Sequence, residues 1–226
     1  ILRDEPFKNA VNMPPVPANV MAKLQPYFLL GERMGKFLSQ MADAAPQEII
    51  VNYSGELAEV DTAPLTRYIV KGVLSQHLGS DVNIINAMHM AKIRDVNIIR
   101  EKSSASKGFT NLITVTLRSG RTERSIAGTL LNGYGPRIVK IDQYPVDVSP
   151  EGNILLVAHT DKPGIIGRLG SVLGDSNTNI ATMQVGRKVV GGSAIMVLTV
   201  DKPAPKEAIE ELSNLPDIEQ VKEILL

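Results

Sequence analysis

The chain has 226 residues, which is enough for one or two domains with a buried core. Its 24 basic and 24 acidic residues balance, so no net charge favours nucleic acid or an anionic membrane as a partner. It has no cysteine, which excludes disulfides, thiolate metal ligands and cysteine nucleophiles and is compatible with a cytoplasmic location. We find no signal peptide and no apolar run long enough to span a membrane. Because the sequence starts at Ile1 rather than methionine, we expect a part of a longer chain or a processed product.

Residues 1–46 are predicted to form a linker and a packing helix. The proline-rich run at 9–17 favours extended backbone. After it, apolar residues recur at helical spacing and form one stripe: Tyr27, Leu30, Met34, Phe37, Leu38 and Met41. A lone helix cannot bury such a stripe, so we expect it to cover another surface of the protein.

Residues 47–150 mix helical and strand periodicity and predict a small α+β domain. Strands are expected at 48–53, 96–100, 109–117, 122–131 and 137–142, and helices at 63–78 and 86–94. The dipeptide Ser119-Gly120 between two of these strands is typical of a hairpin turn. We therefore expect mostly antiparallel pairing.

Residues 151–226 follow the order strand, helix, strand, strand, helix, strand. The expected elements are 153–158, 164–173, 179–190, 193–200, 206–212 and 218–225. The first helix is expected to face inward with Ile165, Ile166, Leu169, Val172 and Leu173. A βαββαβ order predicts a ferredoxin-like antiparallel sheet with two helices on one face. The fold class of the whole chain is therefore α+β.

Polar groups gather where the first strand of this segment ends and its first helix begins. The run is His159-Thr-Asp-Lys-Pro-Gly-Ile165, and Asn179 opens the strand after the helix. These residues offer an imidazole, a carboxylate, an amide and the unpaired N–H groups of a helix start. A small zwitterion such as an amino acid needs groups of both signs, so the pattern indicates ligand binding rather than bond-making chemistry.

Each of these residues also has an ordinary structural interpretation. A His at the end of a strand is often a satisfied or surface residue, and Asp161 before Pro-Gly is a favoured helix cap. Asn179 is typical of a turn, and Gly164 of a helix start with no ligand nearby. Both interpretations stay open from the residues alone.

Five basic residues fall within a short span of the middle segment: Arg118, Arg121, Arg124, Arg137 and Lys140. They predict either an anion pocket for a phosphate or a solvated hairpin surface. Strand alternation places Arg137 and Lys140 on opposite faces, so not all five side chains can converge.

The residues that catalysis or metal binding would need are missing. No Gly-x-Gly-x-x-Gly follows a strand, so we expect no dinucleotide site and no cofactor in this chain. His77 and His89 lack partners at metal-ligand spacing, and we predict no metal site. The serines of Ser103-Ser-Ala-Ser-Lys107 have no nearby base to activate them, and a loop is expected there.

Residues 151–226 resemble an ACT domain, a module that senses amino acids, through His159–Ile165 and Asn177-Thr-Asn-Ile180. The middle segment resembles the linking domain of the D-3-phosphoglycerate dehydrogenase family. The residues that carry this likeness are Gly128-Thr-Leu-Leu, the run 136–142 and Pro150-Glu-Gly152, with Asn9-Ala-Val-Asn12 and the run 24–35 resembling the end of that family's catalytic part.

The resemblance implies a regulatory C-terminal part of the long, three-part form of this NAD-dependent family, which acts in L-serine biosynthesis. It implies three parts: the tail of the catalytic part at 1–46, an allosteric substrate-binding domain at 47–150 and an amino-acid-sensing ACT domain at 151–226. NAD and the catalytic residues would belong to the rest of the enzyme, so this chain is not expected to be catalytic by itself.

The resemblance also implies an effector site between paired ACT domains, with L-serine as the feedback effector. Its residues would be His159, Asp161, Gly164, Ile165 and Asn179. The family often carries Asn where this chain has Asp161, which leaves the identity of the effector, serine or a related amino acid, open. An alternative is an assembly or regulatory module such as that of an iron–sulfur L-serine dehydratase, where any cluster ligands would lie on a partner subunit.

Overall fold

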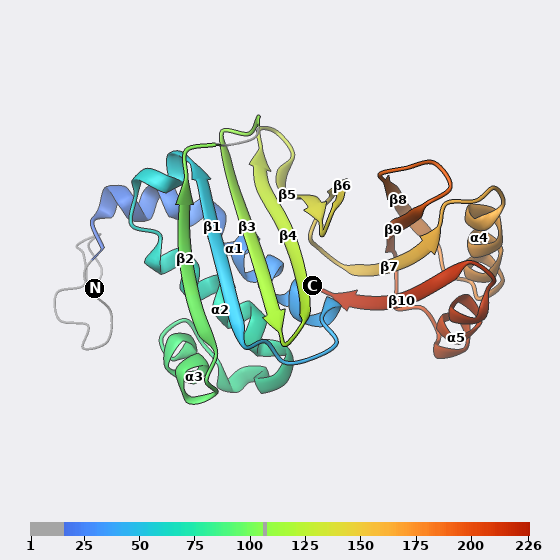
Figure 1. The fold of residues 1–226 in the computed structure, drawn as a ribbon, viewed down its shortest axis with the longest axis horizontal. Coiled ribbons are helices and arrows are strands. Elements are labelled where there is room, and N and C mark those ends of the chain that lie inside the picture. Colours follow the sequence, from blue (N-terminus) through green and yellow to red (C-terminus); the bar gives the residue numbers. More distant parts are fainter. Residues whose placement is uncertain (1–15, 106–107) are drawn as a thin grey trace. The chain divides into compact units, whose positions relative to one another are not determined.

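The computed structural model describes residues 16–105 and 108–226, so most of the proline-rich run at 9–17 lies outside the described residues (Figure 1). The chain divides into two compact units, Ile1–Pro136 and Arg137–Leu226. Each unit is α+β, which confirms the predicted fold class. The predicted domain limits after residues 46 and 150 stay predictions.

The first unit contains a sheet with helices behind it in the view of Figure 1. Its strands are β1 (Glu48–Gly55), β2 (Asn97–Ser103), β3 (Asn111–Ser119) and β4 (Thr122–Leu131). Within this unit the strand order is β2-β1-β3-β4, with β1 and β2 parallel and the other pairs antiparallel. The helices are α1 (Ala18–Met41), α2 (Ala63–Leu78) and α3 (Ala87–Ile93), with short 3₁₀ turns η1 (Glu56–Glu59) and η2 (Gly79–Asp81). The predicted strands and helices of this part are confirmed.

Helix α1 covers α2 and two strands with the apolar stripe that the sequence predicted. It contacts α2, β3 and β4. The stripe residues that are fully buried are Leu30, Met34, Phe37, Leu38 and Met41. The apolar stripe of α1 is therefore buried against α2, β3 and β4 of the same unit.

The two long helices meet backbone to backbone at Gly35 of α1 and Gly72 of α2. A Cβ atom on Gly35 would overlap the carbonyl oxygen of Ile69, and one on Gly72 would overlap the carbonyl oxygen of Glu32. Glycine is needed at both positions because the helix axes approach too closely for any side chain.

Substituting Gly72→Ala is expected to destabilise the first unit by about 1–3 kcal/mol, because the added methyl group must push the two helices apart. The control is Gly170→Ala in the second unit, where a Cβ would meet no atom within 4 Å. That change should be neutral or slightly stabilising, because alanine favours helix. Urea unfolding followed by hydrogen exchange of each unit would check both, and equal stability of the two variants would contradict the close helix contact.

The second unit contains a hairpin and a four-stranded sheet. Its elements are β5 (Gly135–Ile141), whose first two residues belong to the first unit, β6 (Tyr144–Val148), β7 (Asn153–Thr160), α4 (Ile165–Asp175), β8 (Ile180–Arg187), β9 (Ser193–Val200), α5 (Lys206–Asn214) and β10 (Ile218–Leu225). The sheet has the antiparallel order β10-β7-β9-β8. This order confirms the predicted ferredoxin-like βαββαβ arrangement. Strand β6 was not predicted.

The core of this unit lies between the sheet and its two helices. Its buried residues include Leu155 and Val157 of β7, Leu169 and Leu173 of α4, and Leu212 of α5. The prediction that Ile166 faces inward is wrong, since this side chain is 49% exposed. Among the residues that the structure describes, no helix is both long and apolar enough to cross a membrane.

Candidate functional site

His159 closes β7 and is buried, with 2% of its surface exposed. Its Nδ1 atom lies 2.9 Å from the carbonyl oxygen of Thr160, so Nδ1 carries the proton and donates it to this oxygen. The other ring nitrogen, Nε2, is buried and has no hydrogen-bond partner among the described residues. A neutral ring in this orientation would accept a hydrogen bond through Nε2, whereas a protonated ring would donate one, for example to a carboxylate.

Asp161 connects the end of β7 to the turn between β8 and β9. Its Oδ2 atom accepts hydrogen bonds from Nη1 of Arg187 at 2.8 Å and from the N–H of Gly191 at 3.3 Å. Its own N–H donates to the carbonyl of Gly192 at 2.7 Å. The Arg187 hydrogen bond, followed by that of Gly191, lowers the pKa of the Asp161 carboxyl, so this group is held as a carboxylate.

The interpretation of Asp161 as a helix cap is wrong. Helix α4 begins after Gly164, and no side chain caps its first turn. Gly164 has a φ of 88°, in the left-handed region that favours glycine. The side chain of Ile165 belongs to the core, so only its backbone N–H could reach a ligand. The positive end of α4 therefore keeps N–H groups that no side chain satisfies.

Asn179 lies at the opposite end of the sheet from His159. His159 and Arg187 both pair with Ala194 at one end of β9, whereas Ile180, next to Asn179, pairs with Val200 at the other end. At about 3.3 Å per residue, Asn179 lies roughly 20–25 Å from the end where His159 is. Its side-chain N–H donates to Asp201 at 2.8 Å. The structure therefore gathers His159, Asp161 and Gly164, and Asn179 of the same chain is not with them.

Charged residues that the sequence reasoning missed surround the start of α4. Asp217 pairs with Lys162 at 2.6 Å and, more loosely, with Arg168 at 3.9 Å. Its carbonyl accepts the N–H of Thr160 at 2.9 Å. Arg187 was also missed. The sequence offered one indication of Arg187: it is a basic residue shortly before the Gly-Gly turn of the predicted hairpin.

The five basic residues proposed for an anion site are divided between the two units. Arg118, Arg121 and Arg124 belong to the first unit, and Arg137 and Lys140 belong to the second. Arg118 pairs with Glu123 at 2.8 Å and with Glu48 at 3.4 Å, and these hydrogen bonds raise its pKa. Arg137 donates to Asp147 at 2.6 Å.

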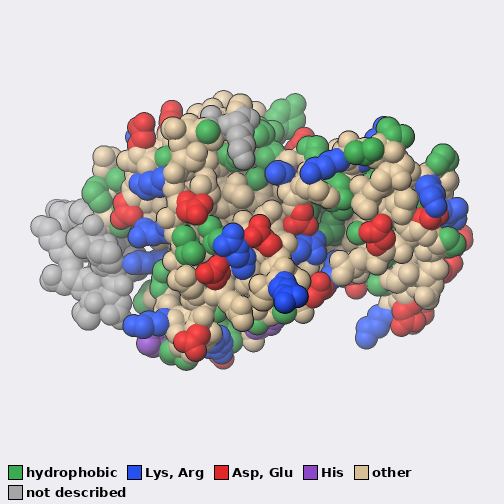
Figure 2. Space-filling view, in the orientation of Figure 1, with side chains coloured by type: hydrophobic (Ala, Val, Ile, Leu, Met, Phe, Trp, Pro, Cys, Tyr) green, Lys and Arg blue, Asp and Glu red, His purple; other side chains and the backbone are tan. Residues whose placement is uncertain are grey.

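Four of these five basic residues are exposed or already paired with a carboxylate. Figure 2 shows basic and acidic side chains interspersed on the face in view. Arg121 and Lys140 are exposed. Two of the five cations, Arg118 and Arg137, already pair with carboxylates, and paired guanidinium groups attract an added phosphate less strongly.

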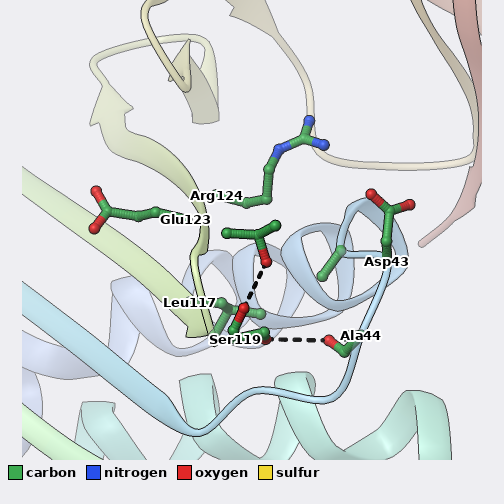
Figure 3. Close-up of a pocket in the computed structure, with 8 residues that line it drawn as sticks. Asp43, Ala44, Leu117, Ser119, Glu123 and Arg124 are labelled. Carbon is green, nitrogen blue, oxygen red and sulfur yellow. Dashed lines mark hydrogen bonds between the residues drawn. The ribbon is translucent and has the colours of Figure 1, made fainter.

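A pocket of ≈ 200 Å³ lies beside the β3–β4 turn (Figure 3). It is lined by Ala42, Asp43, Ala44, Leu117, Ser119, Thr122, Glu123 and Arg124. Arg124 donates to the carbonyl of Met41 at 3.4 Å, and Ser119 donates to that of Ala45 at 2.9 Å. Two carboxylates and one guanidinium line the pocket, so its charge does not favour an anion. Among the described residues, no three His, Asp or Glu side chains are placed to hold a metal ion.

The Asp161–Arg187 pair leads us to predict how the Asp161 carboxyl titrates. Because the pKa of Asp161 is lowered in the folded chain, the pair contributes stability above the ordinary Asp pKa. This contribution is lost as the pH falls through the lowered value. Carboxyl-carbon NMR should show a higher pKa for Asp161 in Arg187→Met, since the main cause of the lowering is removed.

Lys188→Met is the matched control for this titration, because it removes a neighbouring exposed cation. It should leave the pKa of Asp161 unchanged. An Asp161 titration that is the same in wild type and Arg187→Met would show that the pair does not form in solution.

Comparison with known proteins shows the family to which the chain belongs. A family model described as the D-3-phosphoglycerate dehydrogenase intervening domain matches residues 23–142, more than half of the chain. A model of the ACT domain matches residues 153–217, which include the β7–α4 site. The D-3-phosphoglycerate dehydrogenase of Methanocaldococcus jannaschii is 40% identical over 226 residues, covering 100% of this chain and 43% of that protein. That of Bacillus subtilis is 36% identical over 217 residues, covering 96% of this chain and 41% of that protein.

A relative with a different name matches this chain over most of the length of both proteins. The probable L-serine dehydratase beta chain of Bacillus subtilis is 28% identical over 192 residues, 85% of this chain and 87% of that protein. By contrast, the chain spans about two fifths of the two dehydrogenases. The resemblance inferred from the sequence is confirmed: the chain belongs to the D-3-phosphoglycerate dehydrogenase family and carries its intervening domain followed by an ACT domain.

Proposed function

We propose that this chain is the regulatory portion of a D-3-phosphoglycerate dehydrogenase and binds L-serine, or a related amino acid, as a feedback effector between paired ACT domains. The observation that carries the proposal is the buried Nε2 of His159, which has no partner among the described residues and lies five residues before Gly164, where α4 starts without a side-chain cap. A buried polar atom without a partner is costly, and a ligand that bonds to it removes that cost. Oxidation of 3-phosphoglycerate with NAD, in the cytoplasm, would be the work of the whole enzyme.

The groups at this site suit a small zwitterion. The start of α4 offers backbone N–H groups and a positive dipole end to a carboxylate. His159 offers a nitrogen that can accept from an ammonium group or hydroxyl when the ring is neutral. An amino acid with a short hydroxylated side chain would bring a carboxylate, an ammonium group and a hydroxyl.

A two-fold pairing of β8 with the β8 of a second copy would complete the site. Among the described strands of this sheet, β8 pairs with β9 on one side only, which leaves one edge without a strand partner. Antiparallel pairing places the start of one strand opposite the end of the other. Asn179 of one copy would then lie near Arg187, and hence near Asp161, of the other.

Exposed apolar side chains support the same pairing. Val185 of β8 is 40% exposed and Ile166 of α4 is 49% exposed. Val189 and Val190 of the adjoining turn are exposed more fully. All four lie on β8, on the turn that Asp161 holds, or in the first turn of α4. A second copy over this end of the unit would cover them.

Regulation would follow from a difference in effector affinity between two states of the assembly. A ligand held by both copies favours the arrangement in which both sets of contacts are made. Coupling of this kind is typically about 1–3 kcal/mol, or roughly 5- to 150-fold in affinity.

An assembly role is the second candidate. The observation in its favour is the match to nearly the whole of the L-serine dehydratase beta chain of Bacillus subtilis, 85% of this chain and 87% of that protein. In that role the paired ACT domains would hold subunits together, and binding of the effector would not be needed.

Calorimetric titration with L-serine should give saturable binding, with glycine, L-alanine and 3-phosphoglycerate as parallel ligands. His159→Ala should weaken serine binding by about 1–3 kcal/mol, because the Nε2 contact is lost. His77→Ala is the matched control, since His77 is exposed in the first unit and should have no effect on affinity. Circular dichroism of each variant would establish that it folds.

The pattern across the ligands separates the two candidates. Binding of the phosphorylated acid without serine would move the regulatory site away from the start of α4. Wild-type protein that self-associates but binds none of the four ligands would support the assembly role and contradict effector sensing.

A further inference from the structure

The Asp161–Arg187 ion pair leaves most of the arginine fork open. One N–H of Arg187 donates to Asp161 at 2.8 Å, and the Arg187 side chain is 52% exposed. A guanidinium group has five N–H donors in a rigid plane, which suits the two oxygens of a carboxylate. The pair therefore presents a cationic group that is held in place and still has donors to offer.

Asp161 is placed to hold Arg187 rather than to meet an ammonium group. Its side chain is 19% exposed, and its Oδ2 atom already accepts from both Arg187 and Gly191. The adjacent guanidinium offsets its negative charge. The attraction of this carboxylate for a ligand cation is correspondingly weaker.

The surrounding charges also favour an anionic group. Three cations, Lys162, Arg168 and Arg187, lie about two carboxylates, Asp161 and Asp217. The uncapped start of α4 adds a positive dipole end. A ligand carboxylate would thus meet more positive than negative charge at this end of the sheet.

We propose that Arg187 holds the carboxylate of the effector and that Asp161 is a positioning residue for its guanidinium group. The inference rests on the proposed function, because it names the residue that sets ligand specificity at that same site. Arg187 ends β8, so in the two-fold pairing its open donors face the start of the partner's strand, where the carboxylate would lie between the two copies. The site would then require a free α-carboxylate, and amides or esters of the same amino acid would bind poorly.

The test compares L-serine with L-serinamide, which keeps the ammonium and hydroxyl groups and lacks the carboxylate. Calorimetry on wild type, Arg187→Met, Arg187→Lys and Asp161→Asn would be paired with sedimentation to measure self-association. Wild type should prefer serine by about 10- to 100-fold, as expected for a charge-assisted pair. Arg187→Met should lose most of its affinity for serine and little of its affinity for serinamide, so the preference should fall to about threefold or less.

The other variants separate positioning from direct contact. Arg187→Lys keeps the charge and loses the fork, so it should retain self-association and an intermediate preference for serine. Asp161→Asn keeps an acceptor oxygen for Arg187 and should weaken serine binding less than Arg187→Met does. Lys188→Met should behave as wild type.

Several results would overturn the inference. One is an equal loss of serine and serinamide binding in Arg187→Met that still self-associates, and another is no loss at all. A larger loss of serine binding in Asp161→Asn than in Arg187→Met would indicate that Asp161 itself contacts the ligand, through its ammonium group. Failure of the wild type to bind serine or serinamide would contradict the proposed effector function itself, and this outcome is distinct from a failure confined to the variants.

Discussion

The pairing of β7 on both sides is the constraint on which the candidate site depends. This strand lies between β10 and β9, so its register is fixed twice. Leu155 and Val157 fill the core beneath the helices, and strand alternation places His159 on the same face. A slip of one residue would move Leu155 and Val157 off the face that the helices cover and would turn His159 to the other face. Burial of apolar side chains earlier in the same strand thus determines where the imidazole lies.

Asp161, directly after β7, fixes the position of neighbouring segments relative to this strand. Through its backbone it is tied to Gly192, and through its side chain to Gly191 and Arg187, so the β8–β9 turn and the end of β8 are held against the end of β7. The same contacts neutralise much of its charge. Under the proposed function, Asp161 would therefore repel the carboxylate of an amino-acid effector less than an unpaired carboxylate would.

Much of the fold could be predicted from the sequence because its signals are local. The apolar stripe of α1 and the βαββαβ order depend on periodicity within each element, and both are found in the structure. Strand β6 was missed because it is five residues long and contains Pro145. The exposure of Ile166 and the Arg187–Asp161 pair could not be predicted, since the first depends on how far α4 is covered and the second on the register of a hairpin. The sequence singled out the residues of the β7–α4 motif, which stay predictions as a ligand site, but not Arg187, which pairs with Asp161.

The distance between Asn179 and His159 makes effector binding and self-association parts of one equilibrium under the proposed pairing. One copy holds the imidazole, the helix start and the guanidinium, and the amide lies at the far end of its sheet. If a ligand needs groups from both ends, a single copy can bind it only weakly. Any ligand that binds the pair better than the single copy must then strengthen the pair by the same factor. Under the proposed pairing, an ACT domain of this geometry would respond to the amino acid by changing how firmly two chains are joined.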